Sequence, residues 1–130
     1  MSKTAILCVD DEVIILLSLI QELKKAFGNR FIYEKAHNGD SALKLIQELD
    51  REGIKTIFII TDWLMPGKKG DALLEEIREH FPDTKAILIT GQADQEAIDR
   101  ILANKLAISV LQKPWRPELL KKTIEAHMSV

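Results

Sequence analysis

Acidic, hydroxyl and basic residues stand directly after several short apolar runs of this 130-residue chain. They are Asp10 and Asp11, Asp62, Thr90 with Gly91, and Lys113 with Pro114. Any one of them has a purely structural interpretation, because aspartate and threonine often cap the next helix and a lysine after a strand is usually solvated. Capping does not explain why acids, a hydroxyl and an amine all follow strands, so the group as a whole indicates a functional site.

The charges of this group indicate which chemistry it suits. Clustered carboxylates repel one another and would take up protons or destabilise the fold unless a cation lay among them. Oxygen ligands without histidine or thiolate favour a hard divalent ion, and Mg²⁺ typically uses one or two carboxylates together with phosphate oxygens. A carboxylate can also be a nucleophile that forms an acyl phosphate. Phosphoryl chemistry is therefore indicated, and Asp62, Lys113 and Thr90 are suited to accept the group and neutralise its charge.

The apolar runs themselves predict five strands. Their nearly continuous apolar character is typical of strands that are covered on both faces of a sheet. They span residues 5–9, 31–33, 57–60, 86–89 and 107–111. Helical patterns occupy residues 12–27, the stretch after Asn38-Gly39, about 71–80, about 95–104 and the stretch after Pro117. Gly28-Asn29 predicts a left-handed cap at the end of the first helix.

This alternation of strands and helices predicts an α/β fold with a parallel sheet and right-handed crossovers. In such folds ligands bind beyond the carboxyl ends of the strands, near the point where the strand order reverses. Because the polar residues follow the strands, we expect them to meet at that edge.

Composition limits the classes of protein that remain. The length fits one domain over residues 1–130, and 46% hydrophobic residues are enough for one core. A formal charge of −2 argues against direct binding of nucleic acid. A single cysteine, Cys8, suits a reducing compartment, so we expect a cytoplasmic protein. The longest apolar run, residues 13–17, is far shorter than the roughly twenty residues that span a membrane, and we expect no secretory peptide before the first strand.

The order and spacing of the motifs add a family resemblance over nearly the whole chain. The motifs are Val9-Asp10-Asp11-Glu12, Asn38-Gly39 before Ala42-Leu43, Asp62-Trp63-Leu64-Met65-Pro66 with Gly70, Thr90-Gly91 and Lys113-Pro114. Each motif alone is weak, but together they closely resemble the receiver domain of two-component response regulators. The resemblance implies a flavodoxin-like, doubly wound fold with five parallel strands in the order 2-1-3-4-5 and five helices.

The resemblance also implies a role for each residue of the group. Asp62 would accept a phosphoryl group from a histidine of a sensor kinase or of a histidine phosphotransfer protein. Asp10, Asp11, Asp62 and the backbone carbonyl of Leu64 would hold Mg²⁺. Lys113 and Thr90 would contact the phosphoryl oxygens, Gly91 would leave space for them, and the bond before Pro114 would be cis. Such a protein is a signalling switch rather than an enzyme, it acts on a downstream protein effector, and a homodimer is one candidate assembly.

Three positions depart from the family pattern. Val110 stands where an aromatic residue usually couples phosphorylation to the far face, and Leu106 stands where glycine is frequent. Leu64 offers no hydrogen bond to an attacking water, so we expect slow autodephosphorylation, partly offset if Gln92 reaches the site.

Ile14 is an apolar residue near the centre of the polar face of the first helix, beside Ser18, Gln21 and Lys25. A single exposed isoleucine is ordinary in soluble proteins. The functional alternative is a docking patch for the kinase, which the family resemblance places at this helix.

Other functions fit less well. An aspartate-nucleophile phosphatase usually has a second aspartate where this chain has Leu64, and a flavodoxin needs a phosphate loop where this chain has Asp10-Asp11. A receiver that docks without phosphorylation stays open because of Val110. The three histidines and Cys8 are predicted to be structural or solvated, and Trp115 supplies no obvious chemistry.

Overall fold

The computed structural model describes residues 3–62, 70–91 and 95–128. Strands and helices alternate along the chain, with one short 3-10 helix, η1, after the first α-helix. The elements are β1 (Lys3–Val9), α1 (Val13–Phe27), η1 (Gly28–Arg30), β2 (Ile32–Ala36), α2 (Gly39–Arg51), β3 (Ile54–Asp62), α3 (Gly70–His80), β4 (Lys85–Thr90), α4 (Gln95–Ala103), β5 (Ser109–Gln112) and α5 (Pro117–Ala126).

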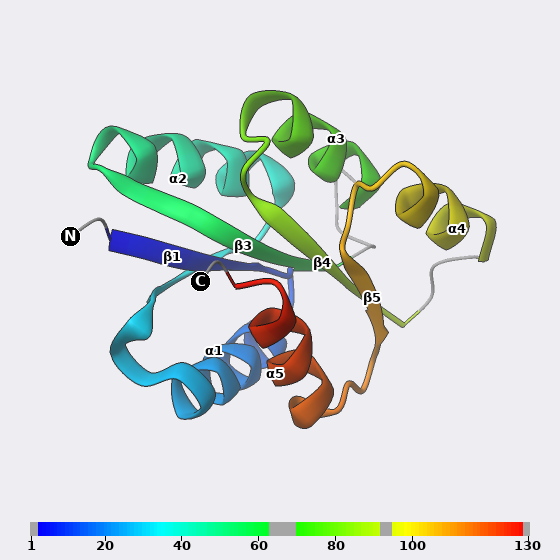
Figure 1. Ribbon diagram of the computed structural model, residues 1–130, viewed down its shortest axis with the longest axis horizontal. Coiled ribbons are helices and arrows are strands. Elements are labelled where there is room, and N and C mark those ends of the chain that lie inside the picture. Colours follow the sequence, from blue (N-terminus) through cyan, green and yellow to red (C-terminus); the bar gives the residue numbers. More distant parts are fainter. Residues whose placement is uncertain (1–2, 63–69, 92–94, 129–130) are drawn as a thin grey trace.

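The five strands form one parallel sheet in the order β2-β1-β3-β4-β5. Helices α2, α3 and α4 lie on one side of the sheet and α1 and α5 on the other (Figure 1). The predicted α/β fold, its strand order and its five helices are therefore confirmed.

Two hydrophobic cores lie on the two faces of the sheet. Side chains alternate across each strand, so Leu7 and Val9 join the core under α2, α3 and α4, whereas Ile6 and Cys8 join the core under α1 and α5. All four side chains are almost completely buried. This double coverage explains why the central strands have continuous apolar runs rather than an alternating pattern.

The two edge strands have different bounds from those predicted. β2 spans Ile32–Ala36 and includes the polar Glu34 and Lys35, because pairing with β1 extends beyond the apolar run. β5 spans Ser109–Gln112 and so begins two residues later than predicted. Central strands also extend beyond their apolar runs, since β1 begins at Lys3 and β3 spans Ile54–Asp62. Backbone pairing with neighbouring strands, and not the apolar run alone, therefore determines where a strand ends.

Two positive φ angles mark the ends of α1 and α4. Gly28 follows α1 with φ 55° and ψ −129°, so it has the predicted positive φ but not the ψ of a left-handed helical cap. Lys105 follows α4 with φ 57°, an unfavourable angle for a residue with a side chain. The amides of Lys105 and Leu106 donate to the carbonyls of Leu102 and Ile101, at 3.1 and 2.9 Å, as in a Schellman motif. The residue with the positive φ is therefore Lys105, one position before Leu106. The side chain of Leu106 packs against the core under α2, α3 and α4.

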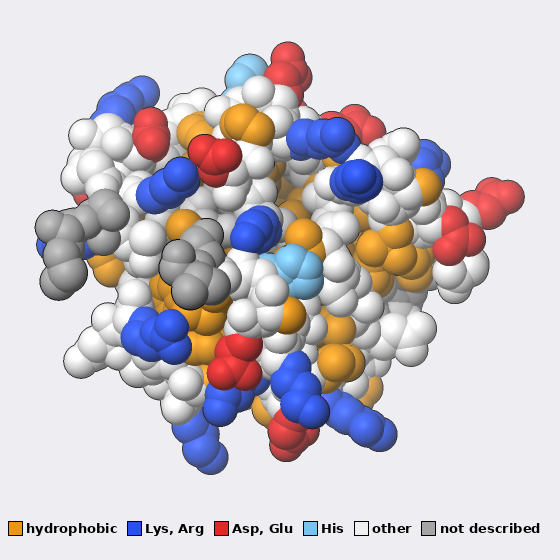
Figure 2. Space-filling view, in the orientation of Figure 1, with side chains coloured by type: hydrophobic (Ala, Val, Ile, Leu, Met, Phe, Trp, Pro, Cys, Tyr) orange, Lys and Arg blue, Asp and Glu red, His pale blue; other side chains and the backbone are white. Residues whose placement is uncertain are grey.

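Exposed apolar residues are concentrated on α1. Val13, Ile14 and Leu17 are 54%, 80% and 48% exposed, so the predicted exposure of Ile14 is confirmed and two apolar neighbours are exposed with it. On the face shown in Figure 2, basic and acidic side chains are interspersed with apolar ones. No helix among the described residues has the length and apolar character needed to cross a bilayer.

Candidate functional site

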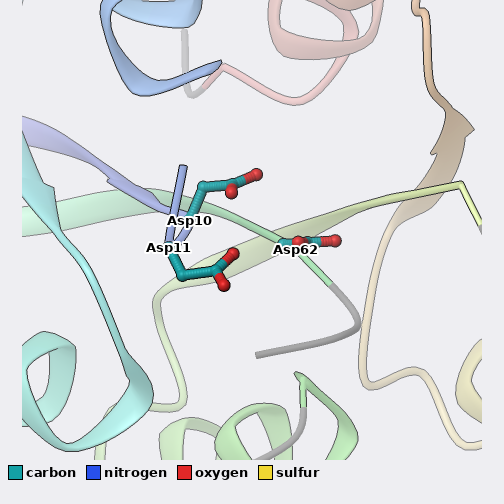
Figure 3. A group of neighbouring side chains, drawn as sticks. All are labelled: Asp10, Asp11 and Asp62. Carbon is teal, nitrogen blue, oxygen red and sulfur yellow. The ribbon is translucent and has the colours of Figure 1, made fainter. Parts of the chain in front are cut away.

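Three aspartates lie together beyond the carboxyl ends of β1 and β3. Asp10 and Asp11 follow β1 directly, and Asp62 is the last residue of β3. These strands are neighbours at the point where the strand order reverses, which is where ligands bind in this type of sheet. Figure 3 shows the three side chains projecting into the same space. One carboxylate oxygen from each lies within 4.8 Å of those from the other two.

The three carboxylates differ in their access to water. Asp10 and Asp62 are 2% and 6% exposed, whereas Asp11 is exposed. Burial of two neighbouring carboxylates is unfavourable unless positive charge compensates them. The site therefore requires a cation next to Asp10 and Asp62.

Lys113 supplies one positive charge. Its Nζ lies 3.0 Å from Oδ2 of Asp10 and 3.3 Å from Oδ2 of Asp62, and its side chain is 19% exposed. Burial lowers the pKa of the Lys113 ammonium, but the hydrogen bond to Asp10 and the negative charges of Asp62 and Asp10 outweigh this effect and raise the pKa above its ordinary value. Lys113 is therefore a firmly charged ammonium between two buried acids.

Asp10 also has a structural role. Its Oδ1 accepts a hydrogen bond from the backbone N–H of Glu12 at 2.9 Å, immediately before α1. The backbone N–H of Asp10 donates to the carbonyl of Ala36 at 3.2 Å. The structural and the functional interpretations of Asp10 are thus both supported, since its two carboxylate oxygens have different partners.

Thr90 and Gly91 complete the same edge of the sheet. Thr90, the last residue of β4, is buried, and its backbone carbonyl accepts a hydrogen bond from the N–H of Lys113 at 3.0 Å. Among the described residues beyond its chain neighbours, a Cβ added to Gly91 would come within 4 Å of Cβ of Lys113 alone, at 3.9 Å, which is an ordinary contact.

The Lys113–Pro114 peptide bond is cis, as the resemblance implies. Leu64, whose carbonyl was expected to bind the metal, lies outside the described residues, as do Trp63 and Gln92.

The donor set fits a hard divalent cation. Three carboxylates are the only group of three or more acidic, histidine or cysteine residues in the described part of the chain that could hold a metal ion. Oxygen ligands of this kind suit Mg²⁺ or Ca²⁺. Three carboxylates and the ammonium of Lys113 leave two negative charges, which a divalent ion would balance. Cys8 is not a competing ligand, because it is fully buried and burial raises the pKa of its thiol.

One contact near the site was not predicted from the sequence. The indole Nε1 of Trp115 donates to Oε2 of Glu22 on α1 at 2.6 Å. These residues are separated by 93 positions, so neither the helical pattern of α1 nor the Lys113-Pro114 motif indicated the pairing.

Comparisons with known proteins identify the family of this chain. The family model for the response regulator receiver domain matches residues 6–125 of this chain. Chemotaxis protein CheY1 from Helicobacter pylori is 28% identical over 123 residues, which cover 92% of this chain and 93% of that protein. The sensor kinase CckA from Brucella abortus is also 28% identical over 123 residues, which cover 95% of this chain but 12% of the kinase. The chain spans less than half of the length of several curated relatives that it matches.

Solved structures show the same likeness. The crystal structure of a response regulator receiver domain protein from Clostridium thermocellum matches with a TM-score of 0.82 and 26% identity, over 95% of this chain and 92% of that one. The sheet order, the acidic group and the family match agree with one another, and this chain belongs to the family of response regulator receiver domains, the signalling modules of two-component systems.

Proposed function

We propose that this chain is a phosphorylatable receiver in which Asp62 accepts a phosphoryl group from a phosphorylated histidine of a sensor kinase or a histidine phosphotransfer protein. The observation that carries the proposal is the position of Lys113, whose ammonium lies within 3.3 Å of the carboxylates of both Asp10 and Asp62 at the strand-order reversal. A lysine so placed can neutralise charge that is added to Asp62.

The transfer needs an acceptor and groups that stabilise negative charge. A carboxylate oxygen of Asp62 forms the new bond to phosphorus, and the bond between phosphorus and the donor's imidazole nitrogen breaks, with its electron pair returning to that nitrogen. Lys113 pairs with the phosphoryl oxygens, and the hydroxyl of Thr90 donates to them. Because phosphoryl transfer depends mainly on positioning and charge stabilisation, these two side chains supply the chain's own part of the catalysis.

Mg²⁺ is the cofactor that this donor set suits best, with Asp10, Asp11 and Asp62 as its side-chain ligands. When bound, it would neutralise charge on the phosphoryl group. The backbone carbonyl of Leu64 remains a predicted fourth ligand, and the apolar side chain of Leu64 remains the reason to expect slow loss of the phosphoryl group.

Signalling requires that phosphorylation favour one conformation over another. Moving a population from 1:99 to 99:1 takes roughly 5.5 kcal/mol of differential interaction, which new contacts from Lys113, Thr90 and the metal would supply in large part. The protein effector that reads the change is a proposed partner, as is a second copy of the chain. Val110, at the usual aromatic position, is half-buried and packs against the core under α3 and α4.

The decisive experiment is phosphorylation without a partner protein. Incubation with Mg²⁺ and phosphoramidate should increase the mass by one phosphoryl group, and Asp62→Asn should show no increase. Asp11→Asn is a second variant, and it should lower the rate while retaining the acceptor. If neither phosphoramidate nor any sensor kinase of the source organism labels the wild type, the receiver docks without phosphorylation and our proposal is wrong.

The exposed patch formed by Val13, Ile14 and Leu17 supports a docking role for Ile14 toward the phosphodonor protein. It lies on the first turns of α1, close in sequence to Asp10 and Asp11. Ile14→Arg should slow transfer from the histidine-containing donor while leaving phosphorylation by phosphoramidate unchanged. Gln21→Arg, on the same exposed face but farther along α1, is the matched control. Equal transfer rates in both variants would remove the patch from the proposal.

A further inference from the structure

A side-chain hydrogen bond connects α1 to the segment that carries Lys113. The bond joins the indole N–H of Trp115 to the carboxylate of Glu22 at 2.6 Å, and bonds to a charged acceptor are shorter and stronger than those between neutral groups. Both residues are half-buried, and the ring of Trp115 packs against the core under α1 and α5. The bond is therefore shielded from water on one side and anchored by apolar packing.

Two hydrogen bonds hold the segment around Lys113. The backbone N–H of Lys113 donates to the carbonyl of Thr90 at 3.0 Å, which connects Lys113 to β4. Two residues later, Trp115 ties the chain to α1 through Glu22. The residue between them is Pro114, whose ring restricts the backbone, so movement of Trp115 is transmitted to Lys113 rather than absorbed.

A groove lies beside the hydrogen bond between Trp115 and Glu22. It has a volume of about 360 Å³ and lies between α1 and the segment after β5, with Ile15, Ser18, Glu22, Lys113, Pro114 and Trp115 as its lining. Ile15 and Ser18 thus face the segment across open space instead of packing tightly against it. Beside this groove, the segment is held to α1 by the packing of the Trp115 ring and by its hydrogen bond to Glu22.

We propose that Glu22 is a positioning residue for phosphoryl transfer: through Trp115 it holds Lys113 at the carboxylates of Asp10 and Asp62. The inference rests on the proposed function of Asp62 and deepens it. Without the carboxylate, the indole N–H loses its partner and the segment moves away from α1. Lys113 then spends less time at the acceptor, and small displacements of a charged group reduce catalysis strongly.

The test compares phosphorylation by phosphoramidate at saturating Mg²⁺, which needs no docking partner. Glu22→Ala should slow phosphorylation by about 3- to 10-fold. Trp115→Phe keeps an aromatic ring but lacks the donor, and it should slow the reaction equally. The double variant should be no slower than either single one, because both remove the same bond. Gln21→Ala, an exposed neighbour on α1, is the matched control and should react at the wild-type rate.

Two further measurements distinguish positioning from general destabilisation. Glu22→Gln retains an acceptor oxygen and should restore the rate to within about twofold of the wild type. The Trp115 indole N–H resonance in NMR spectra should move upfield in Glu22→Ala and return toward its original position in Glu22→Gln. If Glu22→Ala does not fold, Trp115→Phe and Glu22→Gln still provide the comparison.

The outcomes separate this inference from the function on which it rests. A phosphorylated wild type with Glu22→Ala and Trp115→Phe reacting as fast as Gln21→Ala would overturn the positioning role alone. Additive losses in the double variant would also overturn it. A wild type that takes up no phosphoryl group would overturn the proposed function and this inference with it.

Discussion

The chain enters and leaves β5 through two connections that are stabilised in different ways. Before the strand, residues 104–106 are held by backbone hydrogen bonds to α4 residues within five positions. After it, the side chains of Lys113 and Trp115 bind partners that are 103 and 93 positions away, Asp10 and Glu22. The first connection is held mainly by short-range backbone hydrogen bonds, to which the guanidinium of Arg78 adds one long-range bond to the carbonyl of Asn104. The second is held by long-range side-chain bonds from an ammonium and an indole to two carboxylates.

The connection before β5 has a structural role, whereas the connection after β5 also positions a group of the proposed phosphorylation site. The local turn ends α4 and starts β5 in register, which needs no particular charge. The long-range connection brings an ammonium to two buried carboxylates, an arrangement that is costly unless every charge has a partner. We therefore expect substitutions before β5 to change stability alone, and substitutions after it to change both stability and phosphoryl transfer.

The largest effect is expected from Lys113→Ala. It leaves Asp10 and Asp62 buried without their cation, so the unfolding free energy in a metal chelator should fall by about 2–4 kcal/mol. Phosphorylation by phosphoramidate should slow by about 100-fold or more, because a group that stabilises transferred charge is lost. Urea unfolding and mass spectrometry measure the two effects. Lys105→Ala, the lysine of the other connection, is the control, and equal stability of the two variants would contradict the comparison.

Asp10→Asn should remove most of the stabilisation by Mg²⁺. A ligand that binds only the folded state stabilises it by about 2.7 kcal/mol at a hundredfold excess over its Kd. Thermal unfolding with increasing Mg²⁺ should show this gain in the wild type and little of it in the variant. Asp83→Asn, an exposed aspartate paired with Lys55, should keep the full gain. A normal Mg²⁺ response in Asp10→Asn would place the cation elsewhere.

Lys105→Gly should stabilise the protein, because glycine adopts the φ of 57° at this position without the steric strain of a side chain. We expect a gain of about 0.5–1 kcal/mol in unfolding free energy and an unchanged rate of phosphorylation. Lys105→Ala should give no gain, since alanine keeps the unfavourable Cβ. A changed phosphorylation rate in Lys105→Gly would show that the two connections are coupled.

The smallest expected effect is the loss of the stabilising contribution of Lys113 at high pH. The folded-state pKa of Lys113 is raised above its ordinary value of 10.5, so its stabilising contribution is complete below that value and is lost as pH rises through the folded-state pKa. The stability difference between wild type and Lys113→Ala should stay constant from neutral pH to about 10 and narrow at higher pH. Urea unfolding of both proteins across the alkaline range measures it. A difference that narrows near neutral pH would show that carboxylate protonation, not Lys113, controls the site.

Much of the fold could be predicted because helix and strand patterns are local. The existence of the strands was predicted, since burial on both faces of the sheet requires continuous apolar residues such as those of Ile57–Ile60. Their ends were predicted less well, because strand pairing continues past the apolar runs, so that β3 spans Ile54–Asp62 and β2 extends through Ala36. At the end of α4 the family pattern drew attention to Leu106, but the unusual backbone angle is at Lys105, in a turn closed by backbone hydrogen bonds to α4.

The sequence by itself determined which polar residues reach the carboxyl edge of the sheet, because each follows a strand and parallel strands all end at one edge. It also determined that Ile14 is exposed, since helical periodicity places it opposite the buried face of α1. Only the tertiary structure decided the pairings: Lys113 with Asp10 and Asp62, and Trp115 with Glu22. The contacts of Lys113 depend on the order of the strands in the sheet, and the contact of Trp115 depends on how α1 and the segment after β5 approach each other. No local pattern encodes either arrangement.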